Sequence, residues 1–225
     1  MRLNLTLRPA TWMKVFAQGQ DARVWGIDRI THLPPYQDTF NLRQAYIELG
    51  SESNPFTLRT GRQEITFAEE RLVGASNWSN VARTFDAVRL DARSRLIRVS
   101  AFASSAVVAR EGNFDQHTQG NNLHGMFASA ERLIPRTKLE PFLFWRLNPR
   151  VRSELGASGK LDTRTAGLRI SSNVTKSLQF VSEMVVQRGN FATDAVSAWA
   201  GHWRVEQLLG KRYAPKLRLE YNYAT

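Results

Sequence analysis

RLNLTLR, residues 2–8, and KLRLEYNY, residues 216–223, alternate strictly between polar and apolar side chains. Successive side chains of an extended strand point to opposite faces, so each stretch predicts a strand with one apolar and one polar face. Similar alternation occurs at residues 139–147 and 166–171, and no amphipathic-helix pattern competes with it. The sequence therefore predicts an all-β protein.

The same pattern, followed along the chain, gives about twelve strands. Several runs reach ten residues, whereas soluble strands average about five or six and a tilted strand needs roughly nine to eleven residues to cross a bilayer. Short and long connections also alternate, as they do between the two ends of an outer-membrane barrel. We therefore expect an antiparallel transmembrane β-barrel. Its expected strands are 2–8, 12–22, 42–50, 56–65, 83–92, 95–108, 122–132, 138–148, 163–172, 176–188, 194–206 and 214–224, with long connections at 23–41, 66–83, 109–121 and 149–162.

The composition describes a folded, basic chain without cysteine. Its 225 residues carry a formal net charge of +11, and arginine supplies 25 of the 31 basic side chains. Guanidinium forks match carboxylates and phosphates, so the composition indicates anionic partners. The lack of cysteine excludes disulfides and thiolate metal sites, and no apolar run has the length of a transmembrane helix. The mean hydropathy of −0.38 fits strands of which half face water.

One ordered series of motifs points to a family. LRQAYIEL at 42–49 is followed by LRTGRQ at 58–63, RLVG at 71–74, WSN at 78–80 and RTFDAVRL at 83–90. This series resembles the signature stretch of the alginate-export family of bacterial outer-membrane porins. The resemblance implies a non-enzymatic, monomeric channel in the outer membrane, with no cofactor, that passes anionic polysaccharide or smaller anionic solutes through an arginine-lined lumen.

The resemblance also implies a larger barrel than this chain provides, because the family's barrel has roughly eighteen strands. We therefore expect residues 1–225 to form a single partial barrel domain, an internal fragment that lacks the signal peptide. Its expected partners are outer-membrane lipid and the transported anion, and nucleic acid is not among them.

The direction of the side chains decides which residues line the lumen. The parity that turns Val88 and Leu90 toward lipid turns Arg83 and Arg89 into the lumen, roughly 20 Å apart by strand rise. The same test, together with the family motifs, gives a basic set that we expect to contact anions. This set is Lys14, Arg59, Arg62, Arg71, Arg83, Arg89, Arg98, Arg146, Arg169 and Arg218. Acidic residues among them, Glu48, Glu140, Glu183 and Glu220, would hold the guanidinium groups in position.

Two readings compete for the connection at 66–83. It folds into the lumen and narrows it, with Arg71 and Arg83 contacting solute, or it is tethered to the wall by Asp86, with Trp78 packed beneath it. We favour tethering for Asp86 and Trp78 and keep both readings for the arginines. Glu48 is also assigned a structural role.

Aromatic residues divide by face. Trp145, Tyr221 and Tyr223 have the outward parity that an interfacial aromatic girdle requires. Stacking on sugar rings needs inward aromatics, for which Phe142, Phe144, Tyr46 and Trp203 are the candidates. The four histidines, His32, His117, His124 and His202, lack metal-ligand spacing, so no metal site is expected.

Two other classes of protein are also compatible with the sequence. A soluble basic β-domain that binds anionic glycan or nucleic acid would explain the charge, although the bases never cluster into one patch. A polysaccharide lyase is the enzymatic alternative, but no compact catalytic constellation supports it.

Overall fold

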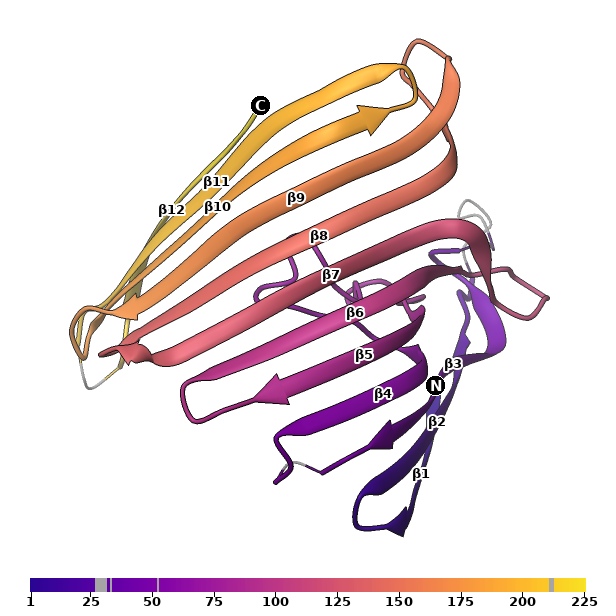
Figure 1. The fold of residues 1–225 in the computed structure, drawn as a ribbon, viewed down its shortest axis with the longest axis horizontal. Helices are drawn as coiled ribbons and strands as arrows, with labels where there is room; N and C mark the ends of the chain where they lie inside the picture. Colours follow the sequence, from indigo (N-terminus) through magenta and orange to yellow (C-terminus); the bar gives the residue numbers. More distant parts are fainter. Residues whose placement is uncertain (27–31, 33, 52, 211–212) are drawn as a thin grey trace. The chain divides into compact units, whose positions relative to one another are not determined.

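In the computed structural model, which describes residues 1–26, 32, 34–51, 53–210 and 213–225, regular structure consists of strands. Twelve strands form one sheet whose strand order follows the chain from β1 to β12 (Figure 1). The all-β prediction is thereby confirmed. Among these residues no helix is long and apolar enough to cross a membrane. The strands are β1 Arg2–Ala10, β2 Met13–Ala22, β3 Asp38–Leu49, β4 Phe56–Gln63, β5 Phe85–Arg93, β6 Ile97–Val108, β7 Gln116–Ile134, β8 Thr137–Arg152, β9 Ser158–Asn173, β10 Leu178–Phe191, β11 Asp194–Leu208 and β12 Lys216–Ala224.

Strand boundaries differ from the sequence prediction mainly in the second half of the chain. Strands β7, β8 and β9 extend further than expected, so the connection predicted at 149–162 shrinks to residues 153–157. Likewise, the connection predicted at 109–121 ends where β7 begins at Gln116. Residues 116–121 are polar on both faces, and residues 149–152 and 158–162 carry few apolar side chains, yet all of them join strands because neighbouring strands supply partners for their backbone groups. The connection predicted at 23–41 lies partly outside the described residues.

The chain forms two compact units, Met1–Asp91 with Phe102–Leu123, and Ala92–Ala101 with His124–Thr225. In the first unit, the apolar side chains of alternate positions are exposed, as Leu5 (57%), Ile47 (38%) and Val88 (50%) illustrate. The intervening positions, such as Gln18 and Tyr46, are buried. We call these two surfaces of the sheet the apolar face and the polar face.

The second unit has the same two faces and a regular register. Strands β9, β10 and β11 pair without a bulge, so each residue has one partner on each neighbour. The row Glu140, Arg169 and Glu183 crosses β8, β9 and β10 on the polar face, while the next positions, such as Leu168 and Met184, are exposed on the apolar face. An exposed apolar face opposite a buried polar one is the inverse of a soluble β-protein and suits a lipid environment.

Candidate functional site: the polar face

A basic and aromatic cluster lies on the polar face of β2, β3 and β4. Cross-strand pairing places Lys14 opposite Glu48 and Glu48 opposite Arg59. Lys14 and Arg59 both form ion pairs with the Glu48 carboxylate, the former with an Nζ to Oε1 distance of 4.0 Å. The Tyr46 ring lies between the two cations, 5.4 Å from Lys14 Nζ and 4.5 Å from Arg59 Cζ. Two cations thus share one carboxylate beside an aromatic ring.

A β-bulge in β3, next to Gln44, changes the direction of the Arg43 side chain. Gln18 pairs with Gln44, whereas the next residue of β2, Gly19, pairs with Leu42, so Arg43 is the extra residue. An extra residue lets two successive side chains reach the same surroundings. Arg43 and Gln44 both donate to Gln18 Oε1.

Arg43 is the most enclosed cation of this region. Its side chain is 4% exposed and pairs with Glu64, and its Nη2 donates to Asn77 Oδ1 at 2.9 Å. Both partners belong to the connection between β4 and β5, residues 64–84. Sequence parity gave no signal for this role, because a bulge cannot be read from alternation.

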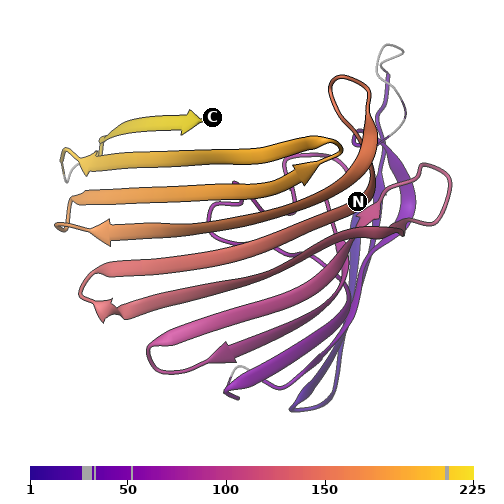
Figure 2. The same ribbon diagram turned by 45° about the horizontal axis from the view of Figure 1, so that its top comes forward.

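The β4–β5 connection lies against the polar face of its own unit. Gln20 Nε2 donates to Asn80 O at 3.0 Å, and Asn80 Nδ2 donates to Tyr36 O at 3.1 Å. Figure 2 draws this connection as purple coil. Its hydrogen bonds with β2, β3 and the residues before β3 hold it there.

Apolar side chains anchor the same connection. Ile65 and Ala75 are fully buried, and the Phe67 ring stacks on Phe102 of β6 at 5.5 Å between centroids. The guanidinium of Arg89 lies 5.5 Å from the Phe67 ring centroid and pairs with Asp91 at 2.8 Å. The connection therefore has a small core of its own on the polar face of β5 and β6.

A second ion pair closes the base of this connection. Arg62, near the end of β4, donates to both oxygens of Asp86, which follows the first residue of β5. His117 Nδ1 lies 2.9 Å from Asp86 Oδ2, and the Phe114 ring is 5.2 Å from Arg62 Cζ. The ion pair between Arg62 and Asp86 thus joins β4 to β5 and restrains the two ends of the connection between them.

Carboxylates in and beside the β6–β7 connection, residues 109–115, bind the start of β3. Glu111 accepts hydrogen bonds from Gln37 Nε2 and from both the backbone N and the hydroxyl of Thr39. Burial alone would raise the pKa of Glu111, but these hydrogen bonds outweigh it and lower the pKa.

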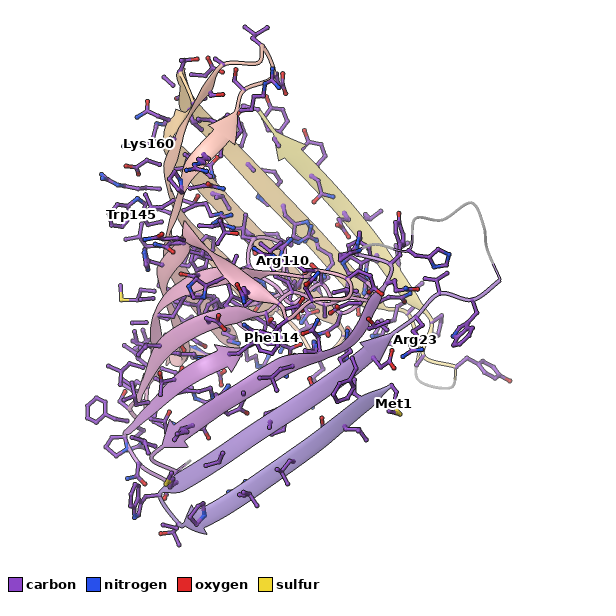
Figure 3. All side chains as sticks on the ribbon, turned by 90° about the vertical axis from the view of Figure 1, so that its right-hand side faces the viewer. Met1, Arg23, Arg110, Phe114, Trp145 and Lys160 are labelled. Carbon is purple, nitrogen blue, oxygen red and sulfur yellow. The ribbon has the colours of Figure 1, made fainter. Side chains whose placement is uncertain are left out.

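Asp115 behaves in the opposite way. Burial raises the pKa of its carboxyl above the usual value, even though Arg110 N donates to it at 2.8 Å. Its carboxyl also hydrogen bonds with that of Asp38 and accepts from Asn41 Nδ2. Figure 3 labels Arg110 and Phe114, which belong to this same connection.

In the second unit, Glu140 is the centre of the charged row. It is 2% exposed and accepts from Arg169, and Lys138 Nζ lies 2.7 Å from its other oxygen. Arg169 Nε is also 4.0 Å from Glu183 Oε2. Beside this row, the Phe142 and Phe144 rings stack at 5.2 Å on the polar face, with Gly167 opposite Phe142.

The remaining predicted cations differ in their surroundings. Arg218 forms an ion pair with Glu206 at 2.8 Å, and Arg71 lies 3.7 Å from Glu69. Arg83 is exposed at the end of the β4–β5 connection, where its backbone N donates to Ala75 O. Arg98 is exposed near the start of β6, and Arg146 donates to Leu147 O at 3.4 Å. Strand pairing therefore brings Lys14, Arg59 and Glu48 together, but not the whole basic set.

Two predicted aromatic positions are wrong. Trp78 was expected beneath the β4–β5 connection, but its side chain is 90% exposed, because the connection fills its interior with Ile65, Val73 and Ala75 instead. Trp203 was expected on the polar face, but it pairs with Tyr221 across β11 and β12 and stacks on its ring at 5.7 Å. Since Tyr221 shares the parity of Leu219 on the apolar face, Trp203 lies there too.

An exposed apolar face, a charged polar face and a connection folded onto the latter are typical of a β-barrel of the outer membrane. The chain belongs to the alginate export family, whose model matches residues 2–225. The family prediction is therefore confirmed, and the protein is a non-enzymatic channel of the bacterial outer membrane. The lyase alternative does not apply.

Solved structures of outer-membrane proteins are similar to this chain. One is the outer membrane channel DcaP of Acinetobacter baumannii, with 10% identity and a TM-score of 0.52 over 100% of this chain and 66% of that one. Another is OmpT, in-vitro folded, an outer membrane protein of Vibrio cholerae, with 9% identity and a TM-score of 0.47 over 99% of this chain and 78% of that one. No curated protein matches the chain. At this identity the similarity to DcaP concerns the fold.

Proposed function

We propose that the protein is an anion-selective channel whose solutes are uronate polysaccharides or smaller carboxylates. The observation that carries the proposal is the cluster of Lys14, Arg59, Glu48 and Tyr46. Two cations beside one carboxylate leave a positive local balance, and their side chains are 24% and 25% exposed, so water and solute can reach them. A cation lowers the energy of a passing carboxylate, and an aromatic ring offers a surface for the apolar face of a sugar.

The β4–β5 connection is proposed as the constriction of this channel. It is fixed to the polar face by Arg43, Gln20 and Phe67, and it carries Arg71 and Arg83 with it. Both arginines are exposed, which suits contact with solute. The other predicted cations, Arg62, Arg89, Arg98, Arg146, Arg169 and Arg218, are proposed to add to the positive potential of the lumen. Arg62, Arg89 and Arg169 each form an ion pair with a different acid. We expect them to contribute less than Lys14 and Arg59, because these two cations share the single carboxylate of Glu48.

The test is ion selectivity in planar bilayers under a salt gradient. We expect anion-selective channels that oligouronates block and neutral oligosaccharides of equal length do not. The double variant Lys14→Gln/Arg59→Gln should move the reversal potential toward zero and weaken the block. The matched control is Arg164→Gln/Arg188→Gln, which removes the same charge from the apolar face and should leave selectivity unchanged. Cation-selective wild-type channels would overturn the proposal, and equal selectivity of both double variants would exclude the Lys14 cluster from it.

A further inference from the structure

The apolar face of the second unit changes abruptly from apolar to basic along its strands. On β9 the outward positions run Ile170, Leu168 and Ala166, and then Arg164. On β10 they run Met184 and Val186, and then Arg188. Because Ala166 pairs with Val186 and Arg164 with Arg188, the change occurs at the same level on both strands.

Trp145 of β8 marks this level. It pairs with Arg164, whose guanidinium carbon lies 5.5 Å from the indole ring, and its Nε1 donates to Asp162 at 2.7 Å. A tryptophan at the end of an apolar band is typical of the boundary between hydrocarbon and lipid head groups. The arginines therefore lie where head groups begin.

More basic side chains follow beyond this boundary. Along β9, the outward positions after Arg164 are Asp162 and then Lys160. Figure 3 shows Lys160 and Trp145 projecting from the same side of the ribbon. Arg150, Arg152 and Lys160 line a hollow of about 560 Å³ with Pro149, Val151 and Ser158. Asp162 lies on the same face, and the balance of Arg164, Arg188, Lys160 and Asp162 is positive.

The cations are not neutralised by other carboxylates. Within the part of the chain that the structure describes, no ion pair joins Lys160, Arg164 or Arg188 to an acid. Arg188 instead donates to the carbonyls of Gln187 and Ala198. Like charges on paired positions of a sheet repel, so Arg164 opposite Arg188 is unfavourable unless an anion lies between them.

The leaflet follows from the topology. Strand direction alternates along the sheet, so the β8–β9 connection is at the same end of its strands as the long β2–β3 and β4–β5 connections. Long connections are outer loops in barrels of this class. The basic surface therefore faces the outer leaflet.

We infer that Arg164, Arg188 and Lys160, beside Trp145, form a binding site for the phosphate groups of an anionic lipid in the outer leaflet. Guanidinium forks bind phosphate oxygens in pairs, and the hollow lined by Arg152 and Lys160 extends the site toward the sugar or glycerol of the head group. The site is independent of the polar face and of the solute that the channel passes.

Native mass spectrometry of the protein in neutral detergent tests the site with diphosphoryl lipid A as the probe. We expect the wild type to retain this lipid and the double variant Arg164→Gln/Arg188→Gln to bind it at least tenfold more weakly. Dephosphorylated lipid A should bind both proteins equally weakly. The control Arg136→Gln/Lys176→Gln removes two cations from the connections at the opposite end and should bind as the wild type does.

Competition by inorganic phosphate separates a lipid site from a phosphate site. Weak competition is expected, because acyl chains and the Trp145 surface add to lipid binding. Equal binding of diphosphoryl lipid A by wild type and Arg164→Gln/Arg188→Gln, or full displacement by millimolar phosphate, would overturn the inference. If that variant does not fold, as judged by heat-modified gel mobility, Lys160→Gln should still weaken binding, and the charge-preserving Arg164→Lys/Arg188→Lys should retain it. Wild-type binding by Lys160→Gln would then contradict the site.

Discussion

Arg43 shows how a single extra residue decides the chemistry of a strand. Since Tyr46 and Gln44 lie on the polar face, strict alternation would place the Arg43 side chain on the apolar face. A guanidinium group in hydrocarbon has an unfavourable free energy. The bulge opposite Gln18 instead turns it toward Glu64 and Asn77. Arg43 therefore binds the β4–β5 connection to the wall.

Removing Arg43 should destabilise the protein more than removing an exposed arginine. Arg43→Met leaves Glu64 without its cation and should lower the free energy of unfolding by about 2–3 kcal/mol, because the lost partner is buried. Arg59→Met should cost less than about 1 kcal/mol, since its ion pair is partly exposed and Lys14 still faces Glu48. Urea unfolding in lipid vesicles, followed by tryptophan fluorescence, measures both. Equal losses would show that Arg43 is not a special anchor.

Asp115 makes the β6–β7 connection sensitive to pH. Its pKa is raised by burial, so the folded protein binds the proton more tightly than the unfolded chain, whose aspartate pKa is about 3.9. The cost of ionising Asp115 is absent below about pH 4 and grows as the pH rises through the raised pKa of the folded state. Acidification across this range should therefore remove the destabilising contribution of Asp115 to the connection.

Hydrogen exchange of residues 109–115 as a function of pH, corrected for intrinsic exchange, measures this effect. Protection should increase as the pH falls toward 4 in the wild type. In Asp115→Asn, which keeps an oxygen for Arg110 N and Asn41 Nδ2, protection should vary less with pH. The same pH dependence in both proteins would exclude Asp115 as its source.

At the scale of the strands, β8 and β9 need a glycine where an aromatic ring crosses from one to the other. A Cβ on Gly167 would lie 2.3 Å from Phe142 Cζ and 2.7 Å from Met184 O. Because the backbone of β10 blocks one side, the Phe142 ring has to move, and its stacking on Phe144 is lost. Gly167 is thus a packing requirement of the polar face.

Gly167→Ala should accordingly lower the free energy of unfolding by about 1–3 kcal/mol through overpacking. Gly210→Ala is the matched control, because the nearest atom to its Cβ would be 3.8 Å away, and it should be nearly neutral. The added variant Phe142→Leu should recover part of the loss in Gly167→Ala. No recovery in the double variant would contradict the contact with Phe142.

For the whole molecule, the tethered β4–β5 connection should set the size of the conducting path. Asn77→Ala combined with Gln20→Ala removes two of its hydrogen bonds to β3 and β2. If the connection constricts the channel, its release should raise single-channel conductance and increase current noise. Ser94→Ala, in the short β5–β6 connection, is the control and should conduct as the wild type does. Unchanged conductance in the double variant would exclude this connection as the constriction.

Sequence alternation predicted the faces of most strands because lipid on one side and water on the other impose a period of two. Val88 outward, Tyr46 and Arg169 on the polar face, and Trp145 on the apolar face all follow from it. The contacts of Asp115, Glu111 and Trp78 could not be predicted, since connections have no period and their partners are distant in sequence. The contacts of Arg43 could not be predicted either, because a bulge depends on the pairing with the neighbouring strand.

The row of Glu140, Arg169 and Glu183 also bears on how the barrel is assembled. A slip of one residue between β8 and β9 would turn Glu140 or Arg169 out of the row and into hydrocarbon, away from its counter-charge. A slip of two residues would keep the faces but separate the charges. Both kinds of incorrect register between these long strands are therefore higher in free energy than the native one during insertion. Only the native register pairs all three charges of the row.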